Sequence, residues 1–426
     1  MTFPFILTNK EYKKFLYLIF FFSLVVRVLF LIFSGVSSES NADWIYRYEI
    51  QSDNILNGNF NLEEKLFITA PLYSYFVAFI KIFFIENYKV VIVIFQIVLS
   101  SISAILISNI GLILFNKYIG VMSGLLYSIY PFTLYFTHIL GQESFFQSLF
   151  IFFIYFYLCY LTKKTNKLLI LSSIFFTLSF LTKSHVIFVI PFVVLSISLI
   201  RDISFSYRIK NILIFLSIIF VLTMPYGIYN FKVNGMYVFS SSGHGGVLLI
   251  SNNDQYYEYL INPPPLNSKK HQELKNSLDF DVLHKVEKKF NDSTSHAIKQ
   301  NLFFKEALNW IMNNKMKYLK MIQVNLFNAL KPGFNYNHYP YKIWLISFLI
   351  SLPVFIFAYF EIGKKLIKYS NNHYFIFYII CAYLIYSTVF YQQGRYRVIT
   401  VEPLYIIYFS SSVFYLFNKF IKKNNK

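Results

Sequence analysis

Long apolar runs recur along almost the whole chain. The first extends from about Phe15 to Phe33, and similar runs follow as far as residue 420. A helix needs about 20 apolar residues to cross the hydrocarbon core of a bilayer, so each run predicts a transmembrane helix. Only 14% of the residues are charged, whereas about a quarter is usual for a soluble domain. The sequence therefore excludes an ordinary soluble enzyme and predicts an all-α polytopic membrane protein.

About ten segments qualify as membrane spans. They lie at about 15–33, 89–115, 118–138, 143–161, 167–182, 185–200, 211–229, 342–361, 373–391 and 398–420. The segment 71–85 is also apolar, but as a helix it reaches only about 22 Å, and it contains Lys81. It is therefore predicted to lie in the membrane interface rather than to cross it.

The distribution of basic residues predicts the orientation. With these spans, most of the short loops that carry Lys and Arg fall on one side together with both termini, as the positive-inside rule requires. The basic residues on this side are Lys10, Lys13, Lys14, Lys117, Lys163, Lys164, Lys167, Arg201, Arg208, Lys210, Lys364, Lys365, Lys368, Lys422, Lys423 and Lys426. Both termini are thus expected in the cytoplasm, with the protein in the cytoplasmic (inner) membrane. This pattern also accounts for the net charge of +19, so we expect membrane lipids, and no nucleic acid, as partners.

Two segments on the predicted outer side are long enough to carry structure. The first is the loop 35–88, and the second is 230–341, which separates an N-terminal membrane module, 1–229, from the C-terminal helices, 342–426. Within 230–341, Asn234-Gly235 is a two-residue hairpin signal, and a helical pattern follows from about 295 to 330. The segment is therefore predicted to be a small external α/β cap.

A few charged residues lie at or near membrane depth, where charge is costly and usually functional. They are Arg27, Asp43, Glu143, Lys183, Arg395, Arg397 and Glu402. Asp43 and Glu143 both fall on the outer side. Each can be explained as a helix-capping acid. If helix packing brings the two together, they suit the deprotonation of an acceptor hydroxyl or the binding of a divalent metal ion.

The basic residues Lys183, Arg395 and Arg397 oppose the positive-inside trend, because they lie at short outer turns. Such groups can bind a lipid phosphate, which Arg does with two hydrogen bonds, or they can snorkel to headgroups. Glu402 is expected to pair with a nearby Arg. Arg27 is expected to face the bundle interior without an assigned role.

The histidines His138, His185 and His244 form no local metal motif. We expect them to be hydrogen-bonded packing residues.

Several short motifs occur in a familiar order. They are Asp43 with Tyr46 and Gly58, Pro71-Leu72-Tyr73, Gln142-Glu143, Leu181-Thr182-Lys183, the stretch from Asn230 to Gly246, and Arg395-Tyr396-Arg397 with Glu402-Pro403. In this order and sidedness the chain resembles the GT-C class of integral-membrane glycosyltransferases. The resemblance is to the protein O-mannosyltransferase-like and aminoarabinose-transferase-like group, and it covers nearly the whole chain.

The resemblance implies outer interfacial helices and an external cap around an active site on the outer face. It implies a polyprenyl-phosphate-linked sugar donor and makes Asp43 the catalytic acid or base, supported by Glu143, where the family often has Asp. Substrate-binding roles would fall to Tyr46, Lys183, Arg395 and Arg397. The acceptor can be a glycan, a lipid or a protein, and metal dependence stays open. The alternatives are a polysaccharide polymerase or ligase of the cell envelope and a non-enzymatic transporter of lipid-linked glycan.

Overall fold

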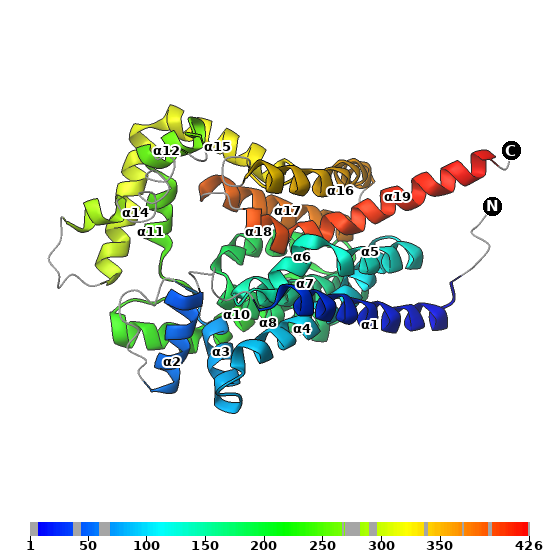
Figure 1. Ribbon diagram of the computed structural model, residues 1–426, viewed down its shortest axis with the longest axis horizontal. Helices are drawn as coiled ribbons and strands as arrows, with labels where there is room; N and C mark the ends of the chain where they lie inside the picture. The colour runs from blue at the N-terminus through cyan, green and yellow to red at the C-terminus, as the bar shows by residue number, and fades with distance from the viewer. Residues whose placement is uncertain are drawn as a thin grey trace.

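The computed structural model describes residues 7–36, 44–58, 69–265, 268, 282–288, 296–335, 340–368, 370–390 and 394–424. Within these ranges every regular element is a helix, and no strand occurs. The long helices run side by side along one axis, with both chain ends at one end of the bundle and α11, α12 and α14 at the other (Figure 1). The prediction of an all-α membrane protein is confirmed in this respect.

The membrane bundle is built from long helices and a few broken ones. Its elements are α1 (Asn9–Ser34), α4 (Tyr88–Leu114), α5 (Lys117–Ile129), α6 (Pro131–His138), α7 (Gln142–Lys163), α8 (Asn166–Thr182), η2 (Ser184–Val189), α9 (Ile190–Ser198), α10 (Phe205–Asn234), α16 (Tyr341–Ile367), α17 (Asn371–Val389), α18 (Gly394–Thr400) and α19 (Glu402–Asn424).

Fewer of these helices can cross a membrane alone than the sequence predicts. By length and hydropathy, seven of the described helices qualify, or eight if α5 and α6 form one span bent by 51°. The bend lies where Pro131 starts α6, since proline cannot continue the hydrogen-bonding of the preceding helix. The apolar run 167–200 is divided at Lys183 into α8 and the short pieces η2 and α9. The predicted number of about ten spans is therefore not confirmed.

Helix α7 forms the centre of the bundle. Within its most apolar stretch of 18 residues, 72% is buried inside the protein. The corresponding shares are 17% for α1, 22% for α10 and 28% for α16. The rings of α7, including Phe146, Phe150 and Tyr157, belong to the largest hydrophobic cluster. The peripheral helices instead expose their apolar side chains, as a lipid-facing surface requires. A polar group on α7 is consequently enclosed by protein on most sides.

The segment 35–88, called the first outer loop after its predicted side, contains short helices that lie across the bundle. They are η1 (Trp44–Glu49), α2 (Ile50–Leu56) and α3 (Leu72–Phe83), and α3 crosses the long axis in Figure 1. Helix α3 buries Tyr73 and Val77 and exposes Phe79 and Phe83. It is too short to count as a candidate span. The interfacial position expected for segment 71–85 stays a prediction.

In the segment 230–341, called the outer segment after its predicted side, the regular elements of the described residues are all helices. It contains α11 (His244–Ser251), α12 (Asp254–Ile261), α14 (His296–Asn313) and α15 (Lys315–Leu330). Helices α11 and α14 pack closely, since a Cβ atom on Gly245 would lie 1.9 Å from the Gln300 carbonyl oxygen. Asn252 fastens α11 to the bundle by donating to the Val389 carbonyl at 3.2 Å.

The predicted hairpin at Asn234-Gly235 is wrong. Helix α10 continues to Asn234, past the predicted module boundary at residue 229, and Gly235 follows with φ +68° and donates its N–H to the Phe231 carbonyl at 2.9 Å. This left-handed glycine is a helix C-cap. An Asn-Gly pair suits a tight hairpin turn and a helix end for the same reason, namely the positive φ. The strand part of the predicted α/β cap is therefore absent from the described residues.

Candidate functional site

Glu143 lies in the first turn of α7 between two basic residues from other elements. It is 6% exposed. Its Oε1 accepts a hydrogen bond from Lys183 Nζ at 3.0 Å, and Arg395 Nη1 lies 3.6 Å from the same oxygen. Lys183 is the residue after α8, and Arg395 is in the first turn of α18. Three segments far apart in the sequence thus meet at one carboxylate.

The local folding explains why Lys183 reaches Glu143. Helix α7 ends at Lys163, and Lys164 takes a left-handed conformation with φ 55° that turns the chain back into α8. Helix α8 then runs antiparallel to α7 and ends beside the start of α7. The break after Thr182 releases Lys183 into an extended conformation, and its side chain, 4% exposed, turns inward. Glu143 and Lys183 therefore form one buried ion pair and are not two independent charged groups.

Two uncharged residues complete the surroundings of Lys183. The Gln142 amide oxygen, assigned toward the donors around it, accepts from Lys183 Nζ at 3.1 Å and from the Tyr48 hydroxyl at 2.8 Å. Tyr48 belongs to η1, so this contact joins the first outer loop to the α7–α8 hairpin. Gln142 is adjacent to a predicted residue, whereas nothing in the sequence singles out Tyr48. Both were missed as site residues.

Tyr396 lies on the other side of the two basic groups. Lys183 Nζ is 5.0 Å from the centre of its ring, and Arg395 Cζ is 5.6 Å away, both within cation–π range. Burial raises the pKa of the Tyr396 phenol, but the charges of Lys183 and Arg395 outweigh burial, so the pKa lies below its usual value. The site therefore carries an excess of positive charge.

His185 differs from the expectation for the histidines. Among the described residues, neither of its ring nitrogens has a hydrogen-bond partner, and its ring lies 5.0 Å from that of Tyr396 and 5.1 Å from those of Phe146 and Tyr386. His138, in contrast, bonds to the carbonyls of Leu134 and Arg27, at 2.7 and 2.9 Å. The His185 ring thus packs against the aromatic rings that line the site.

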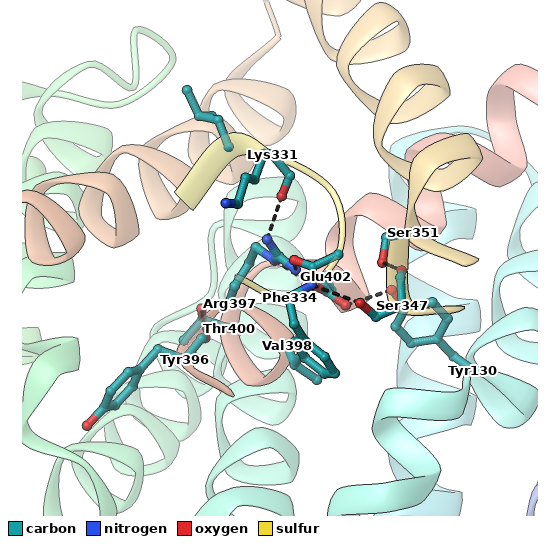
Figure 2. Close-up of polar contacts among 12 residues, drawn as sticks. Tyr130, Lys331, Phe334, Ser347, Ser351, Tyr396, Arg397, Val398, Thr400 and Glu402 are labelled. Carbon is teal, nitrogen blue, oxygen red and sulfur yellow. Dashed lines mark hydrogen bonds and ion pairs between the residues drawn. The ribbon is translucent and has the colours of Figure 1, made fainter. Parts of the chain in front are cut away.

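The two arginines of Arg395-Tyr396-Arg397 have different surroundings. Arg397 is 1% exposed. Its Nε bonds to Glu402 at 2.7 Å, and its two Nη atoms bond to the carbonyls of Lys331 and Gly333 at 2.6 Å each. Figure 2 shows Arg397 and Tyr396 pointing to different sides of α18. Arg395, by contrast, has 34% of its side chain exposed, so an approaching anion can reach Arg395 but not Arg397.

Two predicted site residues cannot be placed. Asp43 lies outside the described residues, so its relation to Glu143 stays a prediction. Tyr46 lies in η1, but its side chain is also outside the described set. Their neighbour Trp44 is fully buried and stacks on Tyr88 with ring centres 6.4 Å apart. The loop that continues from Asp43 is therefore anchored beside the bundle.

The described residues contain no group of three His, Cys, Asp or Glu side chains that could hold a metal ion. Glu143 has two cationic side chains within 4 Å of one oxygen. These cations would compete with a divalent ion at that carboxylate. The arrangement favours binding of an anion, with Arg395 at the accessible edge and Lys183 behind it.

Comparison with known proteins gives a consistent result. Residues 69–229 match the model of the family described as dolichyl-phosphate-mannose-protein mannosyltransferase. The resemblance to the GT-C class is confirmed. The matched segment includes Glu143 and Lys183, but it is less than half of the chain. The comparison with curated proteins gave no match.

Solved structures extend this result to the fold. The oligosaccharyltransferase AglB of Archaeoglobus fulgidus, in complex with an inhibitory peptide and a dolichol-phosphate, aligns with 96% of the chain at 12% identity and a TM-score of 0.59. Its apo form aligns with 97% at 12% identity and a TM-score of 0.59. The chain spans about half the length of these proteins, 50% and 51%. ArnT of Cupriavidus metallidurans aligns with 94% of the chain and 77% of its own length, at 13% identity and a TM-score of 0.42.

Proposed function

We propose that the protein is a glycosyltransferase that moves a sugar from a polyprenyl-phosphate-linked donor to an acceptor hydroxyl or amine at the outer face of the cytoplasmic membrane. One observation carries the proposal. Lys183 and Arg395, from different elements, converge on the buried carboxylate of Glu143. The fold shared with an oligosaccharyltransferase that was solved with a dolichol-phosphate supports the same class of donor.

The leaving group explains the need for two cations. When the acceptor attacks the anomeric carbon, the bond from that carbon to the carrier phosphate breaks, and negative charge grows on the phosphate. Fixed positive groups stabilise this charge in the transition state more than in the ground state. Glu143 keeps Lys183 and Arg395 in place before the donor arrives, and the phosphate then competes with Glu143 for Arg395.

The acceptor must also lose a proton. We assign this step to Asp43, which follows α1 by nine residues and precedes the anchored Trp44. A carboxylate within hydrogen-bond reach of the acceptor takes the proton as the new glycosidic bond forms. In this scheme Glu143 organises the basic groups and Asp43 acts as the base.

The test uses the purified full-length protein with a polyprenyl-phosphate sugar and mass spectrometry of the products. Asp43→Asn preserves size but removes the base, so turnover should fall at least about 100-fold while donor binding and folding persist. Asp53→Asn is the matched control. Asp53 is an acid of the same loop, on α2, and it already pairs with Lys81 of α3 at 2.6 Å. Near wild-type transfer by Asp43→Asn would rule out this mechanism.

The sidedness of the proposal is tested separately. Single cysteines at Ser268 and Ser370, in a chain whose natural cysteines are replaced by Ala, are exposed to an impermeant maleimide in intact cells. Ser268 should be labelled from outside, and Ser370 should be labelled only after the membrane is opened. The reverse pattern would place the site in the cytoplasm.

A further inference from the structure

Gln147 lies one turn after Glu143 on the same face of α7 and joins two other elements. It is 2% exposed. Its Oε1 accepts a hydrogen bond from the Tyr127 hydroxyl at 3.0 Å, and its Nε2 donates to the Val398 carbonyl at 2.9 Å. Tyr127 belongs to α5 and Val398 to α18. A single amide therefore connects the N-terminal half of the bundle with the short helix that carries Arg395 and Tyr396.

The polar chain continues beyond Tyr127 to α1. The guanidinium carbon of Arg27 lies 5.6 Å from the centre of the Tyr127 ring. Arg27 Nη1 also donates to the Ser128 carbonyl at 3.1 Å, and its Nε donates to Ser100 at 2.9 Å. Arg27 is fully buried, and this arrangement gives it a role that the sequence left open. It holds α5 against α1 and thereby fixes the Tyr127 ring.

Helix α18 depends on such outside contacts. It has seven residues, Gly394–Thr400, and a helix of this length is not stable alone. Only Val401 separates it from α19, and the Val401 N–H donates to the Arg397 carbonyl at 3.0 Å. Gln147 adds a hydrogen bond from α7 to the Val398 carbonyl of this short helix. Other polar contacts of α18 come from Arg397, bound to the segment after α15, and from Arg395, at Glu143.

We propose that Gln147 is a positioning residue that sets the place of α18, and hence of Arg395, relative to Glu143. The inference rests on the proposed function for its catalytic consequence, because Arg395 is there the accessible phosphate ligand. Glu143 and Gln147 then act as a pair one turn apart. Glu143 attracts the Arg395 side chain, and Gln147 fixes the backbone that carries it.

The first measurement is independent of activity. A cysteine replaces Arg395 in a chain lacking Cys159 and Cys381, and its rate of reaction with a water-soluble maleimide reports how firmly α18 is held. Gln147→Leu keeps the side-chain volume and removes both hydrogen bonds, so labelling should become roughly fivefold faster. Asn211→Leu is the matched control. It removes a buried 2.8 Å bond to the Tyr160 hydroxyl between α10 and α7, and it should leave the rate unchanged.

The second measurement is kinetic and uses the chain with Arg395 intact. Gln147→Leu should raise the KM for the polyprenyl-phosphate sugar roughly fivefold with a smaller change in kcat, and Asn211→Leu should change neither. Tyr127→Phe removes one of the two hydrogen bonds of Gln147, so it should raise the labelling rate and the donor KM by less. It replaces Gln147→Leu if that variant does not fold. Unchanged labelling in both variants would overturn the inference. If Gln147→Leu speeds labelling but the wild-type chain transfers no sugar, the positioning role stands and the proposed function is rejected.

Discussion

Arg397 and Glu402, five residues apart, form a fully buried ion pair of 2.7 Å across the junction between α18 and α19. The other Glu402 oxygen accepts from the Tyr130 hydroxyl at 2.6 Å. Arg397 reaches in the opposite direction to the carbonyls of Lys331 and Gly333 (Figure 2). The pair thus joins the C-terminal helices both to Tyr130, between α5 and α6, and to the residues that follow α15.

This pair leads to a prediction about stability. Arg397→Ala leaves Glu402 buried without its cation, and breaking a buried pair in this way costs about 3–5 kcal/mol. The free energy of unfolding in detergent should fall by that amount, with loss of the folded protein at growth temperature. A Glu402→Gln variant keeps the Tyr130 contact and should lose less. Wild-type stability of Arg397→Ala would show that the pair is not what holds this junction.

Arg395 should behave differently from Arg397. Because it is the accessible cation of the site, Arg395→Ala should raise the KM for the lipid donor about tenfold or more with little change in stability. Arg395→Lys should restore affinity only in part, since Lys cannot bind a phosphate with two parallel hydrogen bonds. Initial rates over a range of donor concentrations provide the measurement. Equal donor KM values in wild type and Arg395→Ala would leave snorkelling as its role.

The Glu143–Lys183 pair should show strong coupling. Glu143→Gln leaves the buried Lys183 ammonium uncompensated and should cost about 3–5 kcal/mol of unfolding free energy. Lys183→Met should cost less, because Arg395 still faces Glu143. The double variant Glu143→Gln/Lys183→Met should be more stable than the sum of the single effects by at least about 1 kcal/mol. Additive effects would mean that the 3.0 Å contact contributes nothing to folding.

The lowered pKa of Lys331 should make the free energy of unfolding depend on pH. Burial and the nearby Arg397 lower the pKa of Lys331 from 10.5 to about 8. Below about pH 8 the ammonium is charged in both folded and unfolded chains, and folding carries the full cost of burying it. Between about pH 8 and 10.5 only the folded chain releases the proton, so this cost disappears as pH rises.

Lys331→Met removes the titrating group and isolates this effect. Its Tm should exceed that of wild type at pH 7, and the difference should shrink as pH rises from about 8 to 10.5. Lys320→Met, on the exposed face of α15, provides the control and should show a difference that does not vary with pH. A constant difference for Lys331→Met would falsify the assignment.

The sequence predicted the membrane class and the positions of most helices, because hydropathy depends on local composition. It also predicted correctly that Glu402 pairs with a nearby Arg. It could not give the number of spans, because the lengths of α8 and α9 depend on where the chain breaks around Lys183. Nor could it distinguish a hairpin from a helix end at Asn234-Gly235, since both use the same backbone conformation.

The contacts within the candidate site were less predictable. Glu143 and Lys183 are 40 residues apart, and only the antiparallel packing of α7 and α8 brings them together. Arg395 and Arg397 look equivalent in the sequence. Their different surroundings arise because α18 is a helix, in which residues two positions apart point to different sides. Gln142 was noted only as part of the Gln142-Glu143 motif, and no sequence pattern separates Tyr48 and Gln147 from the polar residues of other helices.

The late position of α18 in the chain determines when the site is assembled during synthesis. Glu143 and Lys183 can pair as soon as α7 and α8 have entered the membrane. Tyr130, Gln147 and Glu143 obtain Glu402, Val398 and Arg395 only after the outer segment and the C-terminal helices have been synthesised. A chain that stops within the outer segment would keep buried polar groups without these partners, which is costly in a membrane. The contacts of the candidate site are therefore complete only when the C-terminal helices are in place.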